Sequence, residues 1–223
     1  VAAEKLDHEL RLAAADLCGC APAQIVRDGE TYIGPDEAPH TFEEVVDHAR
    51  SLGFQLATEA RWEVPPIEWD FERGTGTPYF AYVFGAQVAE VEVNRRTGRT
   101  RVIGLWAAHD GGTILFPKGA RGQMYGAIAQ GLGFALLENF RYEQGVPQTT
   151  DFRTYRLPRA LDLPEIEGTF IQTRLDEGPF GAKNMAEPLM VGTAPAIANA
   201  VFHATGVRLH RLPIDPDRLK RPT

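Results

Sequence analysis

The chain has 223 residues, 43% of them hydrophobic and 24% charged, which is the composition of an ordinary globular protein. This length can bury a sizeable core in one large domain or two small ones. The formal net charge of −7 excludes the basic footprint expected of a nucleic-acid-binding protein. No apolar run approaches the roughly 20 residues that span a bilayer, and the N-terminal residues do not resemble a signal peptide. We therefore expect a cytoplasmic protein without nucleic-acid or membrane partners.

The chain has two cysteines, Cys18 and Cys20, separated by a single residue. A disulfide between such near neighbours would be strained, and a zinc site needs more ligands than this pair supplies. We predict two reduced thiols, in keeping with the cytoplasm. An iron-sulfur cluster normally takes four cysteine ligands, so this chain cannot hold one alone.

The N-terminal third begins with an amphipathic helical pattern over residues 1–18, which Gly19 ends. The pattern has no N-terminal cap, and we expect the chain to be a fragment or one piece of a split polypeptide. A short hairpin is predicted over residues 25–33, because Asp28-Gly29 favours a tight turn.

A second helix is predicted to begin at Thr41, since Thr41 and Glu44 have the spacing of a capping box. Its inward face would include Leu52, and Gly53 would end it. Residues 54–64 alternate apolar and polar side chains, which predicts a strand. The following residues, 65–78, are expected to form a loop.

The clearest hairpin spans residues 89–108, with its turn at residues 96–98. It leads into a glycine-rich loop that starts at His109, and then into a long helix predicted from about Gln123 onward. One stripe of this helix consists of very small side chains, at Gly122, Gly126, Ala129 and Gly133. The opposite side can face an ordinary core through Met124, Ile128, Leu132, Ala135 and Leu136.

Two interpretations of this helix stay open. In the first, the glycines only permit tight packing. In the second, free N–H groups at the helix start and the adjoining loop cradle a phosphate or a pterin-like heterocycle. The carboxamide of Gln123, which offers both a donor and an acceptor, would then recognise the edge of the heterocycle.

The C-terminal part is predicted to contain a strand over residues 168–173 and a loop over residues 176–188. A last helix would begin near Thr193 and end at Gly206. Residues 207–212 could form a closing strand. The complete pattern predicts an α+β fold with mixed helices and an antiparallel or mixed sheet, in one portion or in two subdomains of about residues 1–78 and 79–223.

Glu187 is the carboxylate that invites a catalytic interpretation. It lies in a loop rich in glycine, alanine and proline, and Pro188 is expected to hold its backbone extended. If the loop is buried, desolvation would favour use of Glu187 as a general base. The alternative is a solvated glutamate loosely paired with Lys183. For His109 and Asp110, structural hydrogen bonding is favoured over catalysis, because no nucleophile with a supporting partner is evident.

Five ordered motifs carry a resemblance to a known family. They are D-x-G-x-x-x-x-P at residues 110–117, G-Q-x-x-G-x-x-x-Q-G-x-G at 122–133, D-F-x-x-Y-x-x-P at 151–158, G-x-K-x-x-x-E-P at 181–188, and A-x-x-N-A-x-x-x-A-T-G at 196–206. In this order they resemble the C-terminal portion of the molybdopterin-binding large subunit of molybdenum hydroxylases, the xanthine dehydrogenase and aldehyde oxidase family.

The resemblance implies a site, residue by residue. Gly122 and Gln123 would contact the pterin, and Lys183, Asn184, Met185 and Ala186 would line the molybdenum site. Glu187 matches the family's catalytic base, which deprotonates a molybdenum-bound hydroxide; that oxygen attacks an electron-poor carbon while hydride passes to a sulfido ligand. The pterin dithiolene holds the metal, so no protein metal ligand is expected.

The same resemblance implies cofactors and partners. The cofactor would be molybdenum-molybdopterin, with or without a nucleotide extension, and the reaction would oxidise an aldehyde, purine or N-heterocycle. Iron-sulfur clusters and FAD would lie on partner chains or domains. The expected partners are the remainder of the large subunit, an iron-sulfur subunit, an FAD subunit and a small-molecule substrate, in an oligomeric assembly.

Four departures from the family pattern affect the expected activity more than the fold. Asn184 and Ala186 occupy positions where the family usually has glycine, which would alter the site if either position needs a positive φ. Phe116 stands where asparagine is common, and Asn94 where aspartate is common. Two alternatives therefore stay open: a catalytically degenerate structural or assembly subunit of the same fold, and a stand-alone small-molecule binding module.

Overall fold

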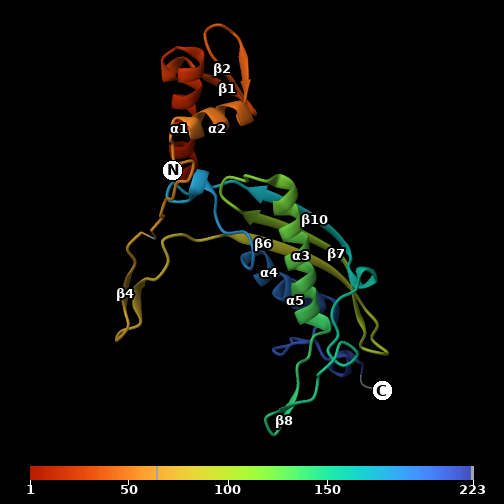
Figure 1. Ribbon diagram of the computed structural model, residues 1–223. Coiled ribbons are helices and arrows are strands. Elements are labelled where there is room, and N and C mark those ends of the chain that lie inside the picture. Colours follow the sequence, from red (N-terminus) through yellow and green to blue (C-terminus); the bar gives the residue numbers. More distant parts are fainter. Residues whose placement is uncertain (64, 222–223) are drawn as a thin grey trace. The chain divides into compact units, whose positions relative to one another are not determined.

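The computed structural model describes residues 1–63 and 65–221, and it has the predicted α+β architecture (Figure 1). Contacts divide the chain into two compact units, Val1–Val64 and Pro65–Thr223. The predicted subdomain boundary near residue 78 stays a prediction. No helix among the described residues is long and apolar enough to cross a membrane.

Unit 1 packs two helices against a three-stranded antiparallel sheet of order β1-β2-β3. Helix α1 is Ala2–Cys18, and Gly19 ends it in the left-handed conformation, as predicted. Helix α2 is Phe42–Ser51, and the capping box predicted at its start is present. The remaining elements are η1 (Pro22–Gln24), β1 (Val26–Asp28), β2 (Thr31–Ile33) and β3 (Pro39–Thr41).

Two expectations for unit 1 were wrong. Residues 54–63 form no strand, and residue 64 lies outside the described part of the chain. Their alternation has another cause, because Phe54 and Leu56 pack against the core of unit 1 without a neighbouring strand. Leu52 is 43% exposed because α2 ends at Ser51, so its side chain does not join the inward face. Both cysteines are free thiols.

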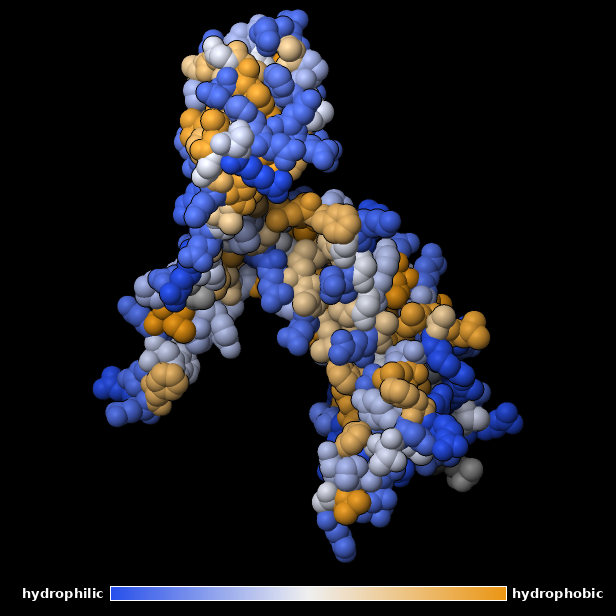
Figure 2. Space-filling view, viewed as in Figure 1, coloured by the Kyte–Doolittle hydropathy of each residue, from blue (hydrophilic) through white to orange (hydrophobic). Residues whose placement is uncertain are grey.

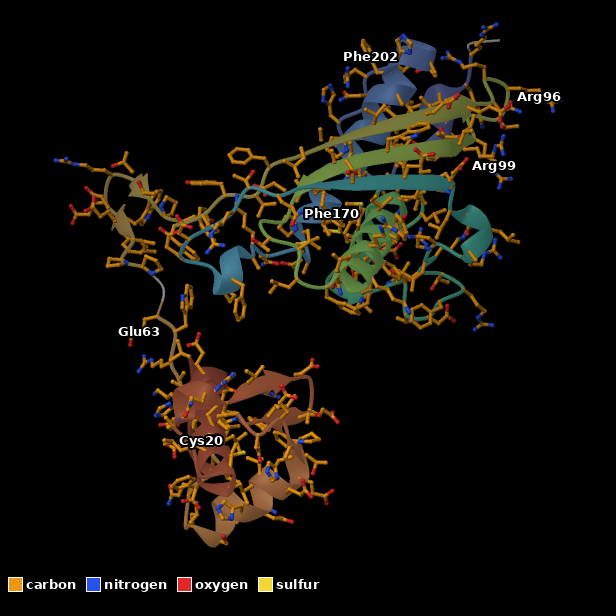
Figure 3. All side chains as sticks on the ribbon, turned by 90° about the horizontal axis from the view of Figure 1, so that it is seen from above. Cys20, Glu63, Arg96, Arg99, Phe170 and Phe202 are labelled. Carbon is orange, nitrogen blue, oxygen red and sulfur yellow. The ribbon has the colours of Figure 1, made fainter. Side chains whose placement is uncertain are left out.

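Unit 2 is built on a three-stranded sheet of order β10-β7-β6. Strands β6 (Gly85–Val93) and β7 (Thr100–Asp110) form the predicted hairpin, and β10 (Glu165–Ile171) pairs with β7 in parallel. Arg96 and Arg99 project from the exposed hairpin turn, whereas Phe170 of β10 packs against the core (Figure 3). The smaller hairpins are β4 (Glu68–Asp70) with β5 (Thr75–Thr77), and β8 (Tyr142–Glu143) with β9 (Val146–Pro147).

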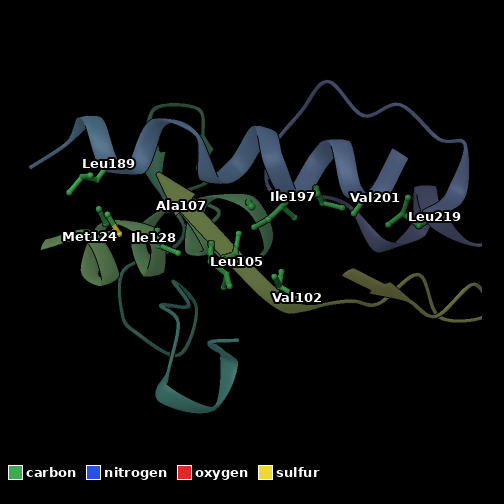
Figure 4. Close-up of a cluster of buried hydrophobic side chains, with 13 residues drawn as sticks. Val102, Leu105, Ala107, Met124, Ile128, Leu189, Ile197, Val201 and Leu219 are labelled. Carbon is green, nitrogen blue, oxygen red and sulfur yellow. The ribbon is translucent and has the colours of Figure 1, made fainter. Parts of the chain in front are cut away.

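Three helices cover one face of this sheet: α3 (Pro117–Leu136), α4 (Pro188–Val191) and α5 (Thr193–Thr205). Short 3-10 segments are η2 (Ala160–Asp162), η3 (Pro179–Gly181) and η4 (Pro216–Leu219). The core between sheet and helices contains Leu105 of β7, Met124 and Ile128 of α3, and Leu189 and Ile197 of α4 and α5 (Figure 4). The predicted inward side of α3 is thus confirmed.

Several boundaries in unit 2 differ from those predicted. Helix α3 begins at Pro117, six residues before Gln123, because proline fits the first helical turn. Strand β10 begins at Glu165, and residues 207–212 form no strand. The predicted loop 65–78 contains the β4-β5 hairpin, in which the positive φ of Gly76 allows close approach to Glu68.

Candidate functional site

A buried ion pair lies where the motifs at residues 110–117 and 181–188 meet. Asp110, the last residue of β7, accepts a hydrogen bond from Lys183 Nζ at 2.5 Å, and the two side chains are 4% and 8% exposed. Lys183 Nζ also donates to the carbonyl of Tyr82. The predicted loose pairing of Lys183 with Glu187 is therefore wrong, because Asp110 provides a buried partner for the ammonium group.

Backbone contacts join the same two motifs. Thr113 N donates to the carbonyl of Gly181 at 2.8 Å, and Lys183 N donates to the carbonyl of Gly111 at 3.0 Å. Gly112 has a φ of 63°, and a Cβ there would lie 2.5 Å from the oxygen of Gly181. The glycines of D-x-G and G-x-K are thus explained by the close approach of two backbone segments.

The environment of Asp110 favours its charged form. Burial raises its pKa, but the hydrogen bonds from Lys183 and from the N–H groups of Gly112 and Thr173 outweigh burial and leave the pKa below the ordinary value. A charged carboxylate whose oxygens accept these hydrogen bonds serves to hold the surrounding segments together. The geometry agrees with the structural interpretation of Asp110.

Beyond Lys183, the loop reaches the surface. Met185 is half-buried, and a Cβ on Gly111 would lie 2.5 Å from its sulfur. Glu187 is exposed, as the solvated alternative expected, so the desolvation argument for a general base does not apply. The residue occupies the N-cap position of α4, with φ −65° and ψ −31°. The expected extended backbone at Glu187 is therefore wrong: the residue is helical although Pro188 follows it, since the proline begins α4.

Asn184 and Ala186 cause no backbone conflict in the loop. Both are exposed, and neither is among the described residues with a positive φ. The side chain of Asn184 accepts a hydrogen bond from Ala186 N at 3.0 Å, which closes a small turn. Asn94 likewise accepts from the N–H groups of Arg96 and Thr97, as an aspartate would. Phe116 is the N-cap residue of α3 and provides no side-chain cap.

The outer face of α3 is open. Gly122, Gln123, Gly126 and Gln130 are exposed, and a Cβ on either glycine would meet no atom within 4 Å. Figure 2 shows a pale strip of weakly polar and apolar residues over this helix. Gly122 is the sixth residue of α3, so its N–H belongs to the helical hydrogen-bond pattern. The free N–H groups expected at the helix start therefore lie upstream of Gly122, in the first turn after Phe116.

This face fits a flat heterocycle in shape and chemistry. A strip without side chains allows close approach of a ring, and the exposed carboxamides of Gln123 and Gln130 offer donors and acceptors to its edge. The inner glycines differ, because a Cβ on Gly131 would lie 2.5 Å from Thr193 and one on Gly133 2.1 Å from Glu138. Tight packing is therefore confirmed for Gly131 and Gly133, whereas a cofactor at the open positions Gly122 and Gly126 stays a prediction.

The motif at residues 151–158 supports the end of α3. Tyr155 OH donates to Glu138 just beyond the helix at 2.5 Å, and this hydrogen bond to the carboxylate is the main reason why the pKa of Tyr155 is raised. A Cβ on Gly133 would also lie 3.0 Å from Pro158. The tyrosine, the proline and the acidic helix end therefore form one structural contact.

A second polar network was missed by sequence reasoning. The amide nitrogen of Gln87 lies 2.6 Å from the carbonyl oxygen of Leu189 and 3.0 Å from His109 Nε2. Thr193 Oγ1 donates to Gln87 Oε1 at 2.7 Å. His109 and Thr193 are 3% and 0% exposed, and burial lowers the pKa of His109. No spacing in the sequence signals this cluster, because its members lie on β6, β7, α4 and α5.

A half-open cavity of about 370 Å³ lies among α3, α4, α5 and the segment at Leu212. Its lining includes Phe134, Glu138 and Met190, and none of the predicted site residues. This cavity therefore lies apart from the predicted site residues.

Unit 2 thus combines an open, glycine-lined helix face with a loop held by a buried ion pair. A family model described as a molybdopterin cofactor-binding domain matches residues 1–164. The chain belongs to this family. The predicted resemblance to the xanthine dehydrogenase and aldehyde oxidase family is confirmed; the loop at residues 183–187 lies beyond the matched range.

Individual relatives agree. The chain is 39% identical over 151 residues to the Escherichia coli K12 protein named "Probable hypoxanthine oxidase XdhD", and 33% identical over 151 residues to the aldehyde oxidoreductase of Megalodesulfovibrio gigas. These matches cover 66% and 67% of this chain, and 16% of each relative. The structure of quinoline 2-oxidoreductase from Pseudomonas putida 86 matches with a TM-score of 0.72 and 27% identity, over 97% of this chain and 28% of that one. The chain thus spans only a small part of each relative's length.

Proposed function

We propose that this chain forms part of the molybdenum-cofactor site of an oxidoreductase that oxidises an aldehyde, purine or N-heterocycle. The observation that carries the proposal is the buried Asp110–Lys183 pair, which fixes the loop leading to Glu187. Glu187 in turn is the N-cap residue of α4, and α4 packs against α3, whose outer face is open. Family membership and the names of the relatives support the choice of cofactor and reaction.

In this proposal the residues of α3 hold the cofactor. The strip at Gly122 and Gly126 accommodates the pterin ring, and the carboxamide of Gln123 hydrogen-bonds to its edge. When bound, the molybdenum cofactor supplies the two-electron oxidation of a carbon centre, with water as the source of oxygen. The site is lined by Lys183, Asn184, Met185 and Ala186. The side chain of Lys183 is buried, and its ion pair with Asp110 holds the loop in place.

Glu187 is the proposed catalytic base. Its carboxylate is exposed and makes no capping hydrogen bond, so its oxygens are free to accept a proton from a nucleophilic oxygen. Lys183 and Asp110 neutralise each other, so Lys183 does not pair with Glu187. The Glu187 carboxylate is therefore available to act as a base.

Loss of catalysis in a degenerate subunit is the rival proposal. Its sequence argument is the presence of side chains at Asn184 and Ala186. The negative φ values at both positions weaken that argument, because neither residue needs the freedom of glycine. A stand-alone binding module is less well supported, since the chain matches only 16% of the length of each of the two relatives named above.

The decisive experiment replaces Glu187 with Gln in the native assembly. Loss of a general base should lower kcat by about 10²- to 10⁴-fold, while molybdenum and pterin content stay unchanged because Gln preserves shape. Glu143→Gln on the exposed β8-β9 hairpin is the matched control and should retain turnover. Retained turnover in Glu187→Gln, with full molybdenum content, would overturn the assignment of the base.

Metal analysis of the assembly purified through this chain tests the cofactor itself. Stoichiometric molybdenum and pterin are expected, together with subunits that carry iron-sulfur clusters and FAD. A metal-free chain without partners, even under molybdate-replete expression, would favour the rival proposals. A cytoplasmic, oligomeric assembly stays a prediction of the same kind.

A further inference from the structure

The network of Gln87, His109 and Thr193 contacts α4, the helix whose N-cap residue is Glu187. The amide of Gln87 reaches the carbonyl of Leu189, two residues after Glu187. It also accepts from Thr193, the first residue of α5. One side chain from the sheet is therefore bonded to both helices that follow the loop.

The orientation of the Gln87 amide follows from its partners. The carbonyl of Leu189 can only accept, so the nitrogen of the amide must face it, and Oε1 must face the Thr193 hydroxyl. The second hydrogen of the nitrogen is then directed to His109 Nε2, which accepts it as a neutral ring. The lowered pKa of His109 agrees with this protonation state.

Close packing leaves this network little room to rearrange. A Cβ on Gly131 would lie 2.5 Å from Thr193 Cβ, and one on Gly192 would lie 3.1 Å from Gln87 Cγ. A Cβ on Gly85 would lie 2.3 Å from His109 Nδ1. Three glycines from three different segments thus surround the network.

His109 and Asp110 are neighbours in β7, and their side chains point to opposite sides of the strand. Asp110 holds Lys183 at the start of the loop, whereas His109 contacts Gln87, which holds Leu189 at the end of the loop. The two ends of the loop that carries Glu187 are therefore connected to adjacent residues of β7, the first end directly to Asp110 and the second through Gln87 to His109.

We propose that Gln87, Thr193 and His109 are positioning residues that set the orientation of α4 and hence of the Glu187 carboxylate. This inference rests on the proposed function, in which Glu187 is the base. None of the three touches the reacting atoms. Their effect passes through Leu189 and the first turn of α5, and a displacement of about 1 Å of a catalytic group can cost about 10²-fold in rate.

The test compares Thr193→Val with Thr193→Ser in the native assembly. Valine keeps the shape but removes the hydroxyl that donates to Gln87, so kcat should fall about 10- to 100-fold, with KM within about twofold of wild type. Serine restores the hydroxyl and should bring kcat back to within about threefold of wild type. Molybdenum content should be the same in all variants.

Thr205→Val is the matched control, because Thr205 donates its hydroxyl to Val201 at the far end of the same helix. It should leave kcat unchanged. Hydrogen-deuterium exchange gives a readout that does not depend on turnover: amides of residues 187–193 should exchange faster in Thr193→Val, and at the wild-type rate in Thr193→Ser and Thr205→Val.

Gln87→Met provides a second variant if Thr193→Val fails to assemble, and it should reproduce the loss of kcat. The proposal would be overturned if Thr193→Val kept the wild-type kcat and exchange rates. It would also be overturned if kcat fell equally in Thr193→Val, Thr193→Ser and Thr205→Val. Failure of both Thr193→Val and Gln87→Met to assemble would also overturn it and leave a folding role. The assignment of Glu187 as the base has its own test, because it would be contradicted by retained turnover in Glu187→Gln.

Discussion

At the scale of single residues, the structure explains why some motif positions carry charge. Asp110 and Lys183 are 73 residues apart in sequence, yet their side chains form a buried pair. Burial of a charge is unfavourable unless it is paired and hydrogen-bonded, and here backbone N–H groups complete the shell around Asp110. Lys183 therefore contributes to the proposed site by fixing the position of its loop.

Lys183→Met should destabilise unit 2 by about 3–5 kcal/mol, because it leaves the Asp110 carboxylate buried without a countercharge. The melting temperature of the assembly measures the effect. Lys118→Met, at an exposed position of α3, should change stability by less than about 0.5 kcal/mol. Adding Asp110→Asn to Lys183→Met should recover part of the loss, since the unpaired charge is gone. Equal melting temperatures for the two lysine variants would contradict the role of the pair.

At the scale of elements, α3 has glycines for two different reasons. Those at positions 131 and 133 face neighbouring segments at distances that exclude a Cβ, whereas those at positions 122 and 126 face open space. An interior glycine costs a helix about 1 kcal/mol relative to alanine. The inner pair is compensated by packing against Thr193 and Pro158, and the outer pair is compensated by nothing within the described chain.

Gly131→Ala and Gly126→Ala should therefore have opposite effects on stability. The first overpacks α3 against Thr193 and should cost about 1–3 kcal/mol. The second should stabilise the helix by up to about 1 kcal/mol, but it should lower molybdenum and pterin content because its methyl group occupies the proposed pterin face. Thermal melting and metal analysis measure both effects. Full cofactor content in Gly126→Ala would place the pterin elsewhere.

At the scale of the whole molecule, buried ionisable groups should make stability depend on pH. Burial lowers the pKa of His109 in the folded state, so the unfolded chain takes up its proton first, near pH 6.5. Stability should then fall as the pH drops from about 6.5 towards the lower folded pKa of His109. Asp110 also has a lowered pKa, and its contribution should persist above about pH 4 and be lost below it.

The melting temperature of wild type should therefore decrease between about pH 7 and pH 5. His109→Gln should show a smaller decrease, because the glutamine does not titrate and can still accept from Gln87. Parallel pH profiles for wild type and His109→Gln would show that His109 does not control acid stability.

The sequence by itself determined the features that depend on local order. Periodicity located α1, α2, α5 and the β6-β7 hairpin, because solvent and core impose a regular alternation on elements that pack on one side. The order of the five motifs correctly predicted the family to which the chain belongs. Residues 54–63 show the limit of this reasoning, since alternation also arises where an extended segment packs without a partner strand.

Only the tertiary structure decided which polar groups meet. Gln87 lies 102 residues from Leu189 and 106 from Thr193, so no periodic pattern could pair them. Lys183 had Glu187 as a near candidate in sequence, but Asp110 offers a buried site in which the Coulombic attraction is stronger. Helical and strand spacing depend on neighbouring residues, whereas the contacts that hold the loop of Glu187 depend on how distant segments pack.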